Sequence, residues 1–100
     1  MLDKLNLEGK TIVVTGGGSG LGKAMSLALA EAGADVVVAA RRQNLIDETA
    51  SEIQNIGRKS LAIATDVTDS KQIENLFSIV RKEFGKIQNS RFIFAMGRFF

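Results

Sequence analysis

The residues with the clearest potential for chemistry form a glycine-rich stretch, Thr15-Gly16-Gly17-Gly18-Ser19-Gly20-Leu21-Gly22. It follows an apolar run, 11–14, that indicates a buried strand, and it precedes an alanine-rich run, 23–32, that indicates a helix. Glycine lacks a Cβ, so such a turn can take positive φ and approach a ligand closely. The free N–H groups of the following helix then favour an anion. The stretch therefore predicts a phosphate-binding turn; the alternative is a glycine-rich turn without a ligand.

The spacing of the glycines narrows the type of site. G-x-G-x-x-G does not fit, because its last position falls on Leu21 or Lys23 when the count starts at Gly16 or Gly18. The phosphate loop G-x-x-x-x-G-K-[ST] fails because Ala24 stands where a hydroxyl should hold Mg²⁺. T-G-x-x-x-G-x-G does fit. The residues that we expect to contact the ligand here are Thr15, Gly16, Gly18, Ser19, Gly20, Leu21 and Gly22.

Two arginines, Arg41 and Arg42, directly follow the apolar run 35–40. In dinucleotide-binding βαβ units an acid at this strand end binds the ribose 2′-OH of NAD, whereas an arginine accommodates the 2′-phosphate of NADP. Asp35 lies at the wrong end of the strand, and Asp47 lies inside the next helix. NADP is therefore favoured over NAD, with Arg41 as the main contact. The alternative is a pair of solvated arginines.

The chain has no His, Tyr or Cys, so Asp, Glu and Lys are the only side chains left for proton transfer near neutral pH. The pairs Asp47/Glu48 and Asp66/Asp69 suit helix-end and turn electrostatics better than catalysis. We therefore predict no catalytic residue and no metal site in this chain.

Composition limits the class of protein. One hundred residues make one small domain at most, and a net charge of +2 without a basic stripe argues against a nucleic-acid partner. The N-terminus lacks the apolar core of a signal peptide, and no apolar run approaches the ~20 residues of a membrane span. The expected location is the cytoplasm.

Apolar runs and helical patterns alternate along the chain. We expect strands at 11–15, 35–40 and 60–65, helices at 20–32, 45–56 and 70–84, and a further strand at 92–96. Because these strands are continuously apolar, they predict an α/β fold with a parallel sheet covered on both faces. Right-handed crossovers place the first two helices on one face and the third on the other, with strand order 3-2-1-4.

From about Leu7 to Ile87 the chain resembles the N-terminal part of a short-chain dehydrogenase/reductase. Four segments support the resemblance beside the strand-end arginine: Leu7-Glu8-Gly9-Lys10, the glycine motif, Asp66-Val67 and Phe84-Gly85-Lys86-Ile87. It implies a partial doubly wound, Rossmann-like domain that binds NAD(P). It also implies an oxidoreductase that transfers hydride to or from a carbonyl or alcohol substrate, of 3-oxoacyl or sugar type. Asp66 would meet the adenine amino group and Val67 would add backbone contacts. Alternatively, Asp66 only shapes its loop.

The resemblance ends after Ile87. The family would continue to Asn-Asn-Ala-Gly, a catalytic Ser and Tyr-x-x-x-Lys, but the chain reads Gln88-Asn89-Ser90-Arg91-Phe92 and has no Tyr. We therefore expect residues 1–100 to form one incomplete dinucleotide-binding domain with an atypical tail at 88–100, inactive alone. The alternatives are a non-catalytic module that binds a nucleotide or a partner, and a truncated fragment. Full-length relatives could be oligomeric.

Overall fold

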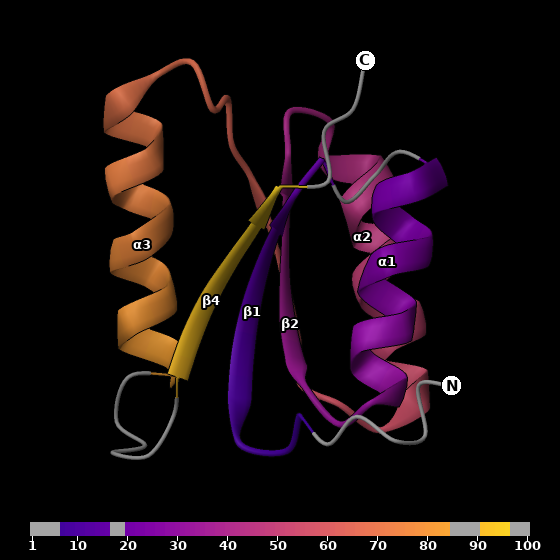
Figure 1. Ribbon diagram of the computed structural model, residues 1–100. Helices are drawn as coiled ribbons and strands as arrows, with labels where there is room; N and C mark the ends of the chain where they lie inside the picture. The colour runs from indigo at the N-terminus through magenta and orange to yellow at the C-terminus, as the bar shows by residue number, and fades with distance from the viewer. Residues whose placement is uncertain (1–6, 17–19, 85–90, 97–100) are drawn as a thin grey trace.

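The computed structural model describes residues 7–16, 20–84 and 91–96. Strands and helices alternate along this part of the chain (Figure 1). The elements are β1 (Lys10–Thr15), α1 (Gly20–Glu31), β2 (Asp35–Ala40), α2 (Gln43–Ile56), β3 (Ser60–Ala64), α3 (Ser70–Phe84) and β4 (Arg91–Met96).

The strands form one sheet in the order β3-β2-β1-β4, and every neighbouring pair is parallel. The register aligns Ile12 with Val36 across β1 and β2, and Val38 with Ala62 across β2 and β3. A parallel pair needs a crossover between its strands, and each helix supplies one. The α/β class that the sequence predicts is therefore confirmed.

Helices cover both faces of the sheet, also as predicted. Figure 1 shows α1 and α2 side by side on one face and α3 on the other. Successive strand residues point to opposite faces, so β1 and β2 each contribute to two cores. The core under α1 and α2 is formed by Ile12, Val14, Ala30, Ala34, Val36, Val38, Ile46, Ala50 and Ile53. The core under α3 is formed by Val13, Val37, Ala39, Leu76, Val80 and Phe84.

The buried face of α1 differs from the sequence prediction. The spacing of Ala24, Ala28 and Ala32, beside Leu21 and Met25, predicts that this row packs on the sheet. The buried residues of the helix are Gly22, Ser26 and Ala30, while Ala24 and Leu21 are exposed. Two members of the predicted row are confirmed: Ala32, directly after the helix, is buried, and Met25 packs against the core. A helix rotates about 100° per residue, so the buried Ser26 lies about 200° from Ala24. Small residues occur on both sides of this helix, so hydrophobic periodicity could not distinguish them.

The start of α2 also needs a correction. Asn44 is a good N-cap type, but the helix begins at Gln43 and its N-cap is Arg42, without a side-chain hydrogen bond. Asp47 therefore lies beyond the first turn. Gln43 explains the early start, because its Nε2 donates to Asp47 Oδ1 at 2.8 Å and to the carbonyl of Ala62 at 3.2 Å. A contact with β3 thus helps to hold the beginning of the helix.

The rest of α2 is mostly as predicted. Ile46, Ala50 and Ile53 are buried, and Gly57 ends the helix with a left-handed φ of +98°. Leu45 and Ile56 do not widen the buried stripe, because they are 37% and 43% exposed.

Helix α3 begins and ends where the sequence predicts. Asp69 caps it, since its Oδ1 accepts the backbone N–H of Lys71 at 3.0 Å. Leu76, Val80 and Phe84 are buried, whereas Phe77, expected on the same face, is 37% exposed. No helix in the described part of the chain has the length and hydropathy needed to cross a membrane.

Candidate functional site

The carboxyl ends of β1, β2 and β3 bring three loops to one edge of the sheet. The N–H of Gly16 donates to the carbonyl of Ala39 at 2.7 Å, and the N–H of Thr65 donates to the carbonyl of Ala40 at 2.8 Å. The strand pairing therefore continues one residue beyond β1 and β3. In open α/β sheets, ligands bind outside the carboxyl ends of the strands, where the strand order reverses. Here that point lies at β1, between β2 and β4.

The glycine turn starts at this edge with a conformation that needs glycine. Gly16 has a φ of +76°, in the left-handed region that residues with a Cβ rarely adopt. Thr15, just before it, is buried at 2% exposure, and its Oγ1 finds no hydrogen-bond partner among the described residues. The turn thus combines a left-handed backbone conformation, which favours glycine, with the buried hydroxyl of Thr15 beside it.

Helix α1 begins where the turn ends. A Cβ built on Gly20, its first residue, would meet no atom within 4 Å. Packing among the described residues therefore does not require glycine there. The first N–H groups of a helix have no partner inside it, and α1 has no acidic residue in its first turn. Such a helix end can accept a phosphate.

The remaining predicted contacts of the turn have different surroundings. Leu21 is 55% exposed, and Gly22 is buried beneath the first turn of α1. The hydroxyl of Ser26 donates to the carbonyl of Gly22 at 2.8 Å, which holds that turn together. Gly18 and Ser19 lie outside the described residues, as does Gly17 between the strand and the helix.

Arg41 and Arg42 directly follow β2 and are both exposed; we call this pair the arginine tip of β2. The two residues before them, Ala39 and Ala40, carry no charge. The charge at this end of β2 is therefore positive. The arginine tip is thus held next to the glycine turn by the Gly16–Ala39 hydrogen bond.

Asp66 lies on the third loop and organises it. Its Oδ1 accepts the backbone N–H of Thr68 at 3.0 Å and the Thr68 hydroxyl at 2.6 Å. These two hydrogen bonds lower the pKa of Asp66, and the Coulombic attraction of Arg41 contributes in the same direction. The loop-shaping role that the sequence left open is therefore present. Because a carboxylate offers about four acceptor sites, this role leaves capacity for a ligand.

Gln72 joins the same loop in a way the sequence did not predict. Its position suggests a capping box with the backbone N–H of Asp69. Instead, its Oε1 accepts the backbone N–H of Asp66 at 2.8 Å, and its Nε2 donates to Asp69 Oδ2 at 3.3 Å. Val67, the other predicted residue, is half-buried.

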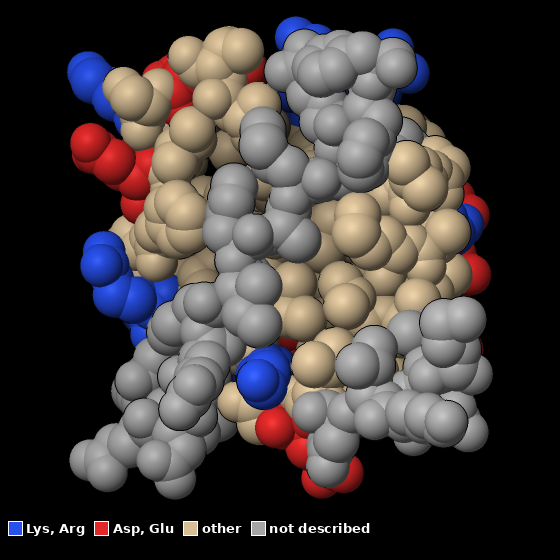
Figure 2. Space-filling view, in the orientation of Figure 1, with Lys and Arg blue, Asp and Glu red and all other residues tan. Residues whose placement is uncertain are grey.

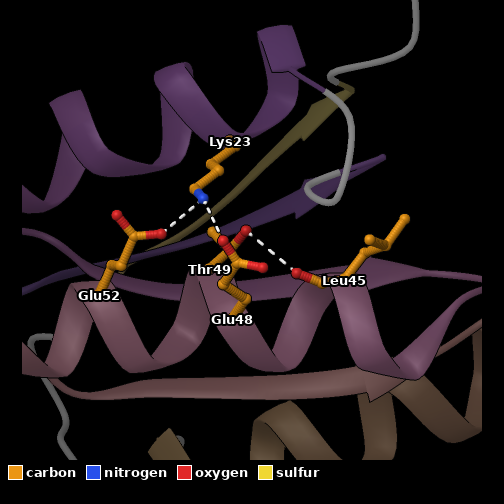
Figure 3. A network of polar contacts seen from close by, with 5 residues as sticks. All are labelled: Lys23, Leu45, Glu48, Thr49 and Glu52. Carbon is orange, nitrogen blue, oxygen red and sulfur yellow. Dashed lines mark hydrogen bonds and ion pairs between the residues drawn. The ribbon is translucent and has the colours of Figure 1, made fainter.

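An ion-pair cluster lies near the glycine turn, and sequence reasoning missed it. Lys23 on α1 contacts Glu48 and Glu52 on α2 (Figure 3). The sequence does show the two glutamates at i, i+4 spacing. It does not show their partner, because Lys23 lies 25 residues from Glu48. Within the described ranges, no group of three or more potential metal ligands occurs.

Charge around the molecule is mixed. Figure 2 shows both basic and acidic side chains around the margin of this face, mixed with uncharged residues. Among the described side chains visible in that view, the basic residues do not form a continuous patch.

Comparisons with known proteins agree on one family. The family model described as short chain dehydrogenase matches residues 10–89. An uncharacterized oxidoreductase of Mycobacterium tuberculosis is 39% identical over 87 residues, which are 87% of this chain and 33% of that protein. The chain thus spans about a third of the length of the curated relatives that it matches.

Solved structures give the same result. A short-chain type dehydrogenase/reductase from Mycobacterium marinum is 40% identical with a TM-score of 0.78, and the match covers 85% of this chain and 35% of that one. An NAD⁺-bound xylitol dehydrogenase is 27% identical with a TM-score of 0.77, and the match covers 81% and 31% of the two chains. The chain belongs to the short-chain dehydrogenase family, of which it represents an N-terminal part.

Proposed function

We propose that this chain binds a dinucleotide at the carboxyl edge of its sheet, and that it prefers NADP to NAD. The observation that carries the proposal is the pairing of the Gly16 turn with the arginine tip of β2, through the 2.7 Å hydrogen bond from Gly16 to Ala39. A turn for the pyrophosphate and cations for a 2′-phosphate are thus neighbours. The similar xylitol dehydrogenase is NAD⁺-bound, which supports dinucleotide binding; the preference for NADP rests on the arginines alone.

The described residues fit such a cofactor. Helix α1 has no acidic residue in its first turn to repel a phosphate, packing does not account for the glycine at position 20, and Gly16 turns the backbone before the helix with its positive φ. The planar guanidinium of Arg41 suits a phosphate, and β2 ends without the acid that would accept a ribose 2′-OH. Asp66 and Val67, on the next loop, would face the adenine. Arg42 would support Arg41 from the following position.

The reaction class follows from the family. When bound, NADP(H) supplies or accepts the hydride that an oxidoreductase exchanges with a carbonyl or alcohol substrate. This chain would contribute binding and orientation of the cofactor. It has no Tyr, His or Cys to hold the proton that must move with the hydride. We infer that residues 1–100 bind the cofactor without turning over substrate. A 3-oxoacyl or sugar-like substrate and a cytoplasmic location remain predictions.

Calorimetric titration of the purified chain with NADP⁺ and with NAD⁺ tests the proposal. We expect saturable binding of both, with the lower Kd for NADP⁺. Equal Kd values would contradict the cofactor preference and leave dinucleotide binding intact. Binding of neither cofactor would contradict the proposed function itself.

A further inference from the structure

Three charged side chains join the helix behind the glycine turn to its neighbour. Lys23 lies in the first turn of α1, and its Nζ is 2.9 Å from Glu48 Oε1 and 2.6 Å from Glu52 Oε2. The two glutamates lie four residues apart and so project from the same side of α2. Figure 3 shows both carboxylates pointing from α2 toward the lysine.

Both of these helices begin at the proposed cofactor edge. Helix α1 starts at Gly20, directly after the glycine turn, and α2 starts at Gln43, directly after Arg41 and Arg42. The cluster therefore connects α1, whose start would hold the pyrophosphate, to α2, which follows the arginines that would contact the 2′-phosphate. Lys23 lies in the first turn of α1, and the two glutamates lie within about three turns of the start of α2.

The fully buried residues near this ion-pair cluster are small. The buried residues of α1 are Gly22, Ser26 and Ala30, and between the two glutamates α2 buries Thr49 and Ala50. Larger side chains of α1, Met25, Leu27 and Leu29, are only partly buried against the shared core. The hydroxyl of Thr49 donates within its own helix, to the carbonyl of Leu45 at 3.4 Å. Helices keep their register by interlocking ridges of side chains, and small residues make low ridges. Directional hydrogen bonds between charged groups can therefore add to the register that packing provides.

We propose that the Lys23–Glu48–Glu52 cluster is a clamp that sets the position of the glycine turn relative to the arginine tip, which makes Lys23 a positioning residue for recognition of the 2′-phosphate. The inference rests on the proposed function. NAD lacks the 2′-phosphate, so its binding depends less on where Arg41 lies. Lys23 acts through the two helices, since its ammonium group is already held by two carboxylates.

The test compares the two cofactors in variants of the whole chain. Ion pairs that are partly exposed have modest effects, so we expect Lys23→Met to raise the Kd for NADP⁺ about threefold to fivefold and to change the Kd for NAD⁺ less than about twofold. The double variant Lys23→Glu/Glu48→Lys keeps net charge and composition and restores a cation between acids on facing helices. It should return the ratio of the two Kd values to that of the wild type. Lys82→Met, on the far end of α3, is the matched control.

Amide hydrogen exchange in the cofactor-free protein provides an independent readout. The first turns of α1 and α2 should exchange faster in Lys23→Met and should regain wild-type rates in the charge-swapped variant. Unchanged exchange, or an unchanged ratio of the Kd values in Lys23→Met, would overturn the clamp. A double variant that fails to restore the ratio would show that a cation at position 23 acts on the ligand directly. If the wild type binds neither cofactor, the proposed function fails, and hydrogen exchange still decides whether the clamp exists.

Discussion

Gly16 and Arg41 contribute to the proposed site in different ways. The backbone of Gly16 makes the turn, with a φ of +76° and an N–H that donates to Ala39. The side chain of Arg41 contributes charge at the end of the neighbouring strand, where it is exposed. A substitution at Gly16 should therefore affect every dinucleotide, whereas a substitution at Arg41 should affect only one that carries a 2′-phosphate.

Arg41→Asp should reverse the cofactor preference. It removes the cation that faces the 2′-phosphate, adds a repelling anion and supplies the carboxylate that a ribose 2′-OH prefers. Charged hydrogen bonds are worth roughly 1.5–3 kcal/mol, so the Kd for NADP⁺ should rise about tenfold to a hundredfold or more. The Kd for NAD⁺ should stay constant or fall. Titration with both cofactors measures this, and Lys82→Asp gives the same charge change on a remote helix. Equal weakening of both cofactors would show that Arg41 does not contact the 2′-phosphate.

Gly16→Val should weaken NADP⁺ and NAD⁺ by the same factor, because a side chain would block the pyrophosphate and strain a turn with positive φ. The same strain can lower the free energy of unfolding. Gly20→Ala separates the two effects, since its Cβ would meet no protein atom within 4 Å and alanine favours a helix. Denaturant unfolding of Gly20→Ala should show no loss of stability, while calorimetry should show weaker binding of both cofactors. Unchanged binding of both cofactors by Gly20→Ala would show that the first turn of α1 is not part of the binding site.

The loop between β3 and α3 shows how one element holds a candidate residue. Asp66 accepts two hydrogen bonds from Thr68, while Gln72 from the helix accepts the N–H of Asp66. Asp69 both caps the helix and donates its N–H to the carbonyl of Asp66 at 3.0 Å. The start of α3 therefore determines the conformation of Asp66, so that the cap and the loop form one unit.

Thr68→Val should raise the pKa of Asp66 toward its ordinary value of 3.8. The wild-type pKa is lowered chiefly by the Thr68 hydroxyl, which favours the ionised carboxylate, and the variant lacks that donor. A lowered folded-state pKa stabilises the protein above the unfolded pKa. This contribution is lost as the pH falls through the folded value, so the affected window lies below about pH 4. Titration of the Asp66 carboxyl by NMR measures the shift, and an unchanged pKa would contradict the hydrogen bond as its cause.

At the scale of the whole molecule, the described helices cover the two faces of the sheet unequally. One described helix, α3, covers the face opposite α1 and α2, and β4 forms one edge of the sheet. Leu21 and Phe77, at opposite sides of the sheet, remain 55% and 37% exposed. The described part of the chain thus has the α/β framework of the short-chain dehydrogenase family, and the sequence contains no Tyr, His or Cys.

The isolated chain should oxidise no NADPH in the presence of ketone or aldehyde substrates, even at concentrations where calorimetry shows the cofactor bound. Hydride transfer to a carbonyl needs a proton for the oxygen, and the chain has no Tyr, His or Cys to donate it. Loss of NADPH absorbance measures turnover, with a full-length short-chain dehydrogenase as the positive control. Turnover above the rate without protein would contradict the assignment of a binding-only role.

The sequence by itself determined the order and approximate bounds of the strands and helices. Continuous apolar runs identified buried parallel strands, and the spacing of Ile46, Ala50 and Ile53 identified the buried face of α2 correctly. Gly57 marked a helix end because only glycine adopts its left-handed φ readily. These signals are local: each depends on residues within a turn or two, so no knowledge of the fold was needed.

Only the tertiary structure decided how these elements face one another. The buried row of α1 and the early start of α2 depend on helix rotation and on a contact between Gln43 and β3. Lys23 and Glu48 lie 25 residues apart, and their pairing arises from the packing of two helices on one sheet face. Long polar side chains take whichever partner the folded backbone brings within reach, so their contacts follow from the parallel register and the crossovers rather than from spacing in the sequence.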